Sequence, residues 1–138
     1  MAEAKASPMK ERPLSPHLQI YRWPLPMMMS IAHRATGIGL YFGTMLIAWW
    51  LIAAASGPNA YATFAAFINS FLGRLILFGY TWALLHHMLG GIRHLIWDTG
   101  HGFTANEREW LSLATIVGSV SLTLVVWVIG YLTMGGPR

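Results

Sequence analysis

Three long stretches of the chain are apolar and almost free of charge, and short polar segments separate them. Residues 75–92 and 110–137 contain no Asp, Glu, Lys or Arg, and residues 29–55 become wholly apolar after their first polar positions. A helix needs about 20 apolar residues to cross a hydrocarbon layer of roughly 30 Å. The pattern therefore predicts three membrane-spanning helices, at about residues 29–55, 70–96 and 110–134.

The segments between and before these spans carry turn and capping signals. Residues 57–59 (Gly-Pro-Asn) predict the end of the first span and the start of a short connector. Residues 104–107 (Thr-Ala-Asn-Glu) have the spacing of a capping box, which predicts a short surface segment. Five prolines in residues 1–28 argue against a long helix there. We expect an all-α integral membrane protein with an extended arm (1–28) and a three-span domain (29–135).

Composition supports a membrane protein and excludes several kinds of chemistry. Hydrophobic residues make up 55% of the 138 residues and charged residues only 10%, which is not typical of a soluble domain. Because the chain has no cysteine, it can form no disulfide, ligate no iron–sulfur cluster through thiolates and attach no c-type haem. Any redox cofactor that it binds is therefore held non-covalently.

The basic residues indicate an orientation. The net charge is +4, and the Lys and Arg residues gather in the N-terminal arm and between the second and third spans. This distribution is explained by the positive-inside rule and by anionic headgroups, and it gives no reason to expect nucleic acid as a partner. We expect a cytoplasmic N-terminus. The arm lacks the apolar core of a secretory signal, so we expect a bacterial inner membrane before a mitochondrial one.

The end of the second span carries an unusual group of polar side chains. On a helix, residues i, i+4 and i+7 share a face, which predicts two columns: His87, Gly91 and His94, and His86, Gly90 and Arg93. Each column has an imidazole, a gap without a side chain, and a basic group about 10 Å along the axis. This spacing suits a haem. The imidazole would bind the iron, the edge of the ring would pack against the glycine, and the basic group would pair with the propionates.

The same residues also have a simpler interpretation. A histidine within a membrane helix can hydrogen-bond a neighbouring helix, and two glycines can mark a close helix contact. Spacing does not choose between His86 and His87. Because these neighbours point about 100° apart, they cannot ligate opposite faces of one ring. A second axial ligand would have to come from elsewhere.

A second polar group opens the first span. Ser30, His33 and Arg34 stand at i, i+3 and i+4 and so project from one side of the helix. An arginine at this depth can extend toward the lipid headgroups, or it can face other polar groups within the membrane. A hydroxyl donor and a guanidinium beside an apolar wall of Trp23 and Ile31 would suit a lipid-soluble molecule with a carbonyl head, such as a quinone.

Three segments resemble a known family when they are taken together. They are residues 12–21 (RPLSPHLQIY), residues 30–37 (SIAHRATG) and residues 87–98 (HMLGGIRHLIWD). They closely resemble the cytochrome b subunits of succinate dehydrogenase, which are membrane anchors of respiratory complex II. The resemblance covers roughly residues 12–135 and includes three spans in the expected order.

The resemblance implies a function and a set of partners. In that family a flavoprotein oxidises succinate, and an iron–sulfur subunit passes the electrons to ubiquinone at the membrane. This anchor and a second membrane anchor form the quinone site and share one haem b, to which each contributes one histidine. The chain would thus be a subunit of succinate:quinone oxidoreductase that is not catalytic on its own, and the sequence identifies no catalytic residue in it.

The resemblance also implies roles for individual residues. The haem ligand is the histidine four residues before the glycine of Gly-Ile-Arg-His, which is His87, with the extra His86 as the second choice. Ser30 and Arg34 match the quinone-site serine and arginine, and Trp23 and Ile31 match its apolar wall. The other residues that the resemblance places around the haem and its propionates are His33, Arg34, Gly91 and His94.

Two other functions stay open from the sequence. A quinol:fumarate reductase anchor would use similar parts in the reverse direction. A structural anchor could dock soluble enzymes without binding haem.

Overall fold

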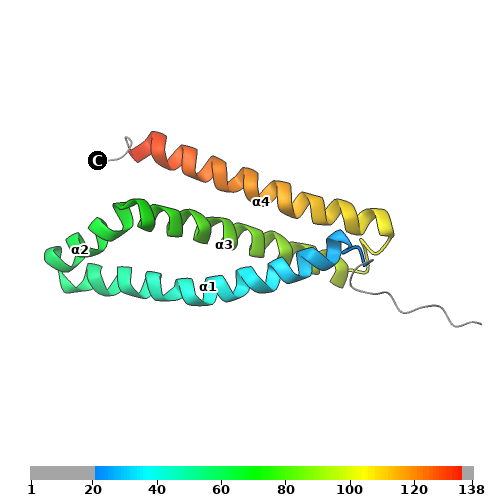
Figure 1. Ribbon diagram of the computed structural model, residues 1–138, viewed down its shortest axis with the longest axis horizontal. Helices are drawn as coiled ribbons and strands as arrows, with labels where there is room; N and C mark the ends of the chain where they lie inside the picture. Colours follow the sequence, from blue (N-terminus) through cyan, green and yellow to red (C-terminus); the bar gives the residue numbers. More distant parts are fainter. Residues whose placement is uncertain (1–20, 135–138) are drawn as a thin grey trace, which may run out of the picture.

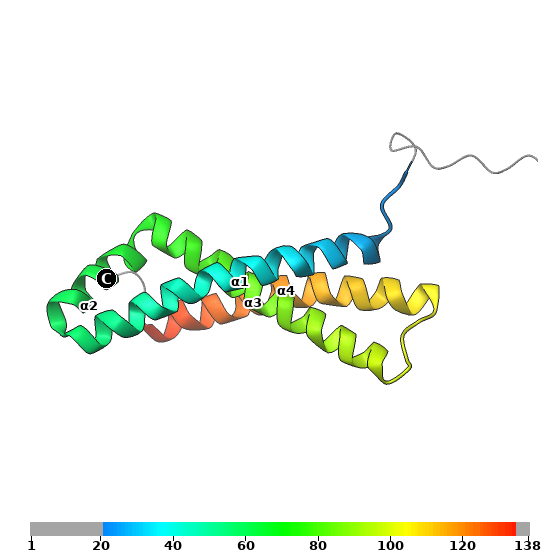
Figure 2. The ribbon, with the colours of Figure 1, turned by 90° about the horizontal axis from the view of Figure 1, so that it is seen from below.

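The chain folds into three long helices that lie side by side, with a short helix closing one end (Figure 1). The computed structural model describes residues 21–134. Its elements are α1 (Leu25–Ser56), α2 (Pro58–Asn69), α3 (Phe71–Asp98) and α4 (Ala105–Met134). α3 packs against both α1 and α4. The start of α1, the end of α3 and the start of α4 lie at the same end of the bundle, opposite α2 (Figures 1 and 2).

The three long helices confirm the three predicted spans. Leu25–Ser56, Phe71–Asp98 and Ala105–Thr133 are each long and apolar enough to cross a membrane. The expected short connector between the first two spans is itself a helix, α2, of 12 residues. Of the expected extended arm, residues 1–20 lie outside the described residues, and residues 21–24 are not helical.

Prolines and one glycine explain where α1 and α2 begin. α1 starts four residues before the predicted position, because Pro24 is extended at the N-cap and Pro26 lies in the first turn. Proline is favoured there, since its missing N–H would have no partner in a first helical turn. Gly57 has a φ of 107°, which only glycine adopts easily, and it separates α1 from α2. Pro58 then begins α2 at once.

Side chains cap the other two spans. The Ser70 hydroxyl accepts a hydrogen bond from the Gly73 amide at 3.1 Å and so caps α3. At the start of α4, the Thr104 amide donates to the Glu107 carboxylate at 3.1 Å, and the Glu107 amide donates to the Thr104 hydroxyl at 3.3 Å. The predicted capping box is therefore present. It opens the third long helix directly and not a separate surface segment, because no helix-breaking residue follows it.

The interior of the bundle is unusually polar and its exterior is apolar. Seven of the buried side chains are polar or charged, namely Thr36, His86, Arg93, Ser112, Thr115, Ser119 and Thr123, whereas the outward faces carry large apolar side chains. Lipid solvates apolar faces well, so membrane helices associate through small residues and hydrogen bonds. The bundle therefore has the surface of a membrane-embedded subunit.

α3 and α4 pack antiparallel in a heptad register. His86 meets Ser119 and, seven residues along α3, Arg93 meets Ser112, which lies seven residues back along α4. Both serines are completely buried. Contacts that recur every seven residues on both helices are typical of helices that cross at a shallow angle, as in a coiled coil. These two hydrogen bonds therefore determine which face of α3 packs against α4.

Candidate functional site

The candidate site lies where the first turns of α1 meet the last third of α3. The His33 and His87 rings stack with their centroids 3.9 Å apart and an interplanar angle of 6°. The His94 ring is tilted 5.4 Å from that of His33. Three imidazoles that are up to 61 residues apart in sequence thus form one cluster between two helices.

The orientation of His87 is set by the backbone of α1. Its Nδ1 lies 3.1 Å from the carbonyl oxygen of His33. A carbonyl oxygen can only accept, so Nδ1 carries the proton and Nε2 keeps its lone pair. This is the arrangement in which a neutral histidine acts as a metal ligand through Nε2 while its other nitrogen is held by a second group.

Two residues of α1 enclose the His87 ring. The Thr36 hydroxyl lies 3.5 Å from Nδ1 and donates its own hydrogen to the Ala32 carbonyl at 2.9 Å. A Cβ added at Gly37 would lie 3.1 Å from the Cε1 atom of His87. Gly37 therefore gives the imidazole the room that it occupies.

The two adjacent glycines of α3 have different surroundings. A Cβ at Gly90 would collide with the His33 ring, whereas a Cβ at Gly91 would meet nothing within 4 Å. The gap beside Gly90 is thus filled by this chain. The gap beside Gly91, on the side of His87 and His94, is open and can receive the edge of a flat ligand.

His86 faces a different helix from His87. It is only 2% exposed, and its Nδ1 lies 3.3 Å from the Ser119 hydroxyl. Because the Ser119 hydrogen goes to the Ile116 carbonyl at 2.9 Å, its oxygen accepts the proton of His86 Nδ1. The Nε2 atom of His86 is buried without a partner among residues 21–134. That atom is therefore not accessible to a metal in this arrangement of the helices.

Arg93 lies in the same column of α3 as His86 and Gly90, and it is also buried. It is 3% exposed, its Nη1 donates to the Ser112 hydroxyl at 3.4 Å, and its guanidinium lies 5.2 Å from the centroid of the Trp97 ring. The sequence predicted that either column could meet a haem. The structure closes the column of His86, Gly90 and Arg93 with side chains of α1 and α4, and leaves only the column of His87, Gly91 and His94 accessible.

The predicted quinone residues lie on the outward side of α1. Trp23 and Ile31 are 52% and 42% exposed, and Ser30 and Arg34 are exposed as well. Within the described part of the chain, no other side chain hydrogen-bonds Ser30 or Arg34. All four residues are therefore accessible from outside the bundle.

Comparisons with known proteins identify the family of the chain. Residues 8–128 match the family described as succinate dehydrogenase/fumarate reductase transmembrane subunit. The chain belongs to this family. It is 46% identical over 118 residues to the succinate dehydrogenase cytochrome b556 subunit of Paracoccus denitrificans, covering 86% of this chain and 91% of that one.

Other members of the family span bacteria and mitochondria. The chain is 35% identical to the cytochrome b556 subunit of Rickettsia felis, covering 93% of this chain and all of that one. It is 40% identical to the mitochondrial cytochrome b560 subunit of Bos taurus, covering 79% of this chain and 66% of that one. These relatives are named as subunits of succinate dehydrogenase, and nothing favours the fumarate reductase alternative.

Sequence reasoning missed the residues that hold the two histidines in place. Thr36 and Gly37 were part of the family motif but had no predicted role, although they line the His87 ring. Sequence analysis gave no individual role to any residue of the third span. On that span Ser112 and Ser119 are the hydrogen-bond partners of Arg93 and His86, whereas Ser121 is exposed. The seven-residue spacing of the two serines, equal to that of His86 and Arg93, was the available signal.

Proposed function

We propose that this transmembrane subunit anchors a succinate dehydrogenase in the bilayer and holds one haem b together with a second membrane anchor. The observation that carries this proposal is the hydrogen bond from His87 Nδ1 to the His33 carbonyl, because it leaves Nε2 free to bind a metal, in the column of α3 that also contains the open position Gly91. Family membership supplies the context, since several relatives are named as cytochrome b subunits.

The residues present fit a haem. His87 would ligate the iron through Nε2, Gly91 would let the ring edge approach α3, and the partner anchor would supply the opposite ligand. His33, His94 and Arg34 would face the propionates. The Nδ1 atom of His33 faces Gly90 and is buried with no hydrogen-bond partner among the described residues, so His33 would meet a propionate through its Nε2. Bound there, the haem would supply a one-electron carrier inside the membrane.

Ubiquinone would bind on the outward side of α1. The Ser30 hydroxyl can donate a hydrogen bond to a quinone carbonyl oxygen, and Arg34 can stabilise the negative charge that builds on the quinone as electrons arrive. Trp23 and Ile31 would form the apolar wall. Neither Ser30 nor Arg34 releases protons at neutral pH, so water and groups of the partner subunits would deliver them.

The assembly would contain three further chains: a flavoprotein, an iron–sulfur subunit and the second anchor. The start of α1, the end of α3 and the start of α4 share one end of the bundle, which would face the cytoplasm of a bacterial cell by the positive-inside rule. The soluble subunits would dock at this end, close to Ser30, Arg34 and His94.

The experiment that tests this function is isolation of the assembly through a tag on this chain in mild detergent. We expect mass identification to find the flavoprotein, the iron–sulfur subunit and a second three-span anchor, and we expect succinate to drive quinone reduction. Recovery of this chain alone, or with unrelated proteins and without that activity, would contradict the proposal.

A further inference from the structure

Arg93 is a buried cation without a counter-ion in the described part of the chain. It is 3% exposed, its Nε has no hydrogen-bond partner, and its contact with Ser112 is long at 3.4 Å. Residues 21–134 contain three carboxylates: Glu107 caps α4, and Asp98 and Glu109 are exposed. None of the three forms an ion pair with Arg93. A guanidinium buried in a membrane helix is costly unless it is paired.

Arg93 faces away from the open side of α3. It follows Gly91 by two residues, which places the two positions about 200° apart around the helix. Gly91 lies on the open side, and Arg93 faces α4 through Ser112. An anion that pairs with Arg93 on this side would therefore approach it between α3 and α4.

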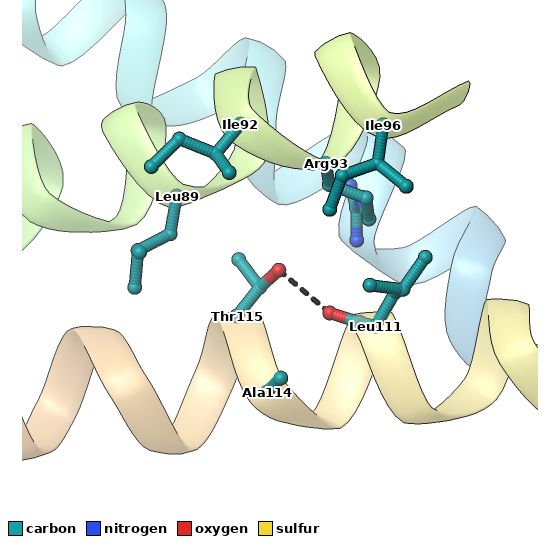
Figure 3. A pocket seen from close by; sticks show the side chains of 7 residues that line it. All are labelled: Leu89, Ile92, Arg93, Ile96, Leu111, Ala114 and Thr115. Atoms are coloured by element: carbon teal, nitrogen blue, oxygen red, sulfur yellow. Dashed lines mark hydrogen bonds between the residues drawn. The ribbon is translucent and has the colours of Figure 1, made fainter. Parts of the chain in front are cut away.

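A groove beside Arg93 is suited to an acyl chain. Figure 3 shows the side chains of Leu89, Ile92 and Ile96 on α3 opposite those of Leu111, Ala114 and Thr115 on α4, with Arg93 set back between Ile92 and Ile96. The Thr115 hydroxyl donates to the Leu111 carbonyl at 2.8 Å, so it does not add a free donor to this α3–α4 groove. The cavity is about 140 Å³. Drug-sized ligands need roughly 300 Å³ or more, whereas part of an acyl chain fits.

The depth of Arg93 matches that of a lipid headgroup. It lies five residues before Asp98, the last residue of α3, or about 7.5 Å along the axis from the helix end. Basic pockets between membrane helices near the cytoplasmic surface bind acidic lipid headgroups. A phosphate accepts two parallel hydrogen bonds from a guanidinium, which would satisfy the donors that Ser112 leaves free.

We propose that the α3–α4 groove binds an acidic phospholipid, with the phosphate on Arg93 and part of one acyl chain between Leu89, Ile92, Ile96, Leu111 and Ala114. The lipid neutralises the buried cation and fills the space between the two helices. It is a structural lipid of the anchor, on the side of α3 opposite the haem and quinone residues.

The test uses the purified, delipidated assembly and measures its melting temperature and its lipid-bound mass by native mass spectrometry. Phosphatidylglycerol, phosphatidylcholine and inorganic phosphate are added separately. Arg93→Gln removes the cation, and Arg108→Gln is the matched control, because Arg108 is exposed at the same end of the bundle. Ala114→Phe fills the groove without changing charge, and Val117→Phe, at a position 61% exposed, is its control.

We expect phosphatidylglycerol to bind the wild-type assembly about fivefold more tightly than phosphatidylcholine, the preference that one basic residue near the surface provides. Arg93→Gln should abolish this preference and Ala114→Phe should abolish binding, while both controls behave as wild type. Three results would overturn the proposal: equal binding of the two lipids by the wild type, a preference that survives Arg93→Gln, or equal stabilisation by inorganic phosphate. Because the readouts are mass and melting temperature, they do not depend on whether the assembly holds haem.

Discussion

The Nδ1 atom of His87 on α3 lies 3.1 Å from the main-chain carbonyl oxygen of His33 on α1. One helix therefore fixes the tautomer of an imidazole on another, and it does so with a backbone atom that a side-chain substitution cannot remove. The adjacent His86 is held just as firmly, but by Ser119 of α4 and with both ring nitrogens buried. Two neighbouring histidines thus have different surroundings, and we expect His87 to be the haem ligand.

Gly37→Ala should weaken haem binding. The new Cβ would lie 3.1 Å from His87 Cε1 and push the imidazole from its position against the His33 carbonyl. Changes to groups that orient a metal ligand cost about tenfold or more in affinity, so we expect a loss of that size in haem titrations of the assembly. Gly39→Ala is the matched control, because a Cβ there meets nothing within 4 Å. Equal haem affinity in the two variants would argue against this packing.

Gly91→Leu should prevent haem binding while the chain still folds and inserts. A Cβ at Gly91 has nothing within 4 Å in this chain, so a larger side chain there obstructs only a ligand or a partner. Gly79→Leu is the control, since its position on α3 is equally free. The measurement is the haem-to-protein ratio of the purified assembly. A normal ratio in Gly91→Leu would show that no haem edge lies on this glycine.

Ser119→Ala should lower the free energy of unfolding by about 1–3 kcal/mol, because it leaves the buried Nδ1–H of His86 without an acceptor. Ser121→Ala should have little effect, since Ser121 is exposed two residues further along α4. Denaturant unfolding in detergent measures both. The double variant His86→Leu/Ser119→Ala should recover much of the loss, because no unsatisfied polar group remains. Additive losses in the double variant would be the contrary result.

Ser30→Ala and Arg34→Leu should each slow quinone reduction by roughly tenfold, the effect of losing about 1.4 kcal/mol of interaction with the reacting quinone. Reduction of an artificial dye by succinate should continue, because that reaction does not need the quinone site. Thr44→Ala is a control on the same helix, as its exposed hydroxyl bonds only the Tyr41 carbonyl. Wild-type quinone kinetics in both variants would place the quinone elsewhere.

The spans were predictable from the sequence because length and hydropathy alone define them. Their boundaries were less predictable. In the sequence, Pro24 and Pro26 belong to a proline-rich segment that favours an extended arm, but proline also suits the first turn of a helix, and α1 begins at Leu25. Helix α2 was missed, since its 12 residues follow a Gly-Pro pair that indicates only a break.

The site was predictable as a set of residues but not as an arrangement. The spacing of His86, His87, Gly90, Gly91 and Arg93 gives their angles around α3, and it cannot tell which neighbour each one faces. The position of α4 decides that question, through Ser119 and Ser112. Those two serines resemble an ordinary packing face in the sequence, because their hydrogen-bond partners lie on another helix.

The most direct test of the central claim is a reduced-minus-oxidised optical spectrum of the purified assembly in three forms: wild type, His87→Ala and His86→Ala. We expect the wild type to show a b-type haem, His87→Ala to lose or alter that spectrum, and His86→Ala to retain it. Succinate oxidation by the soluble subunits should persist in all three. An unchanged spectrum in His87→Ala, together with its loss in His86→Ala, would contradict the account.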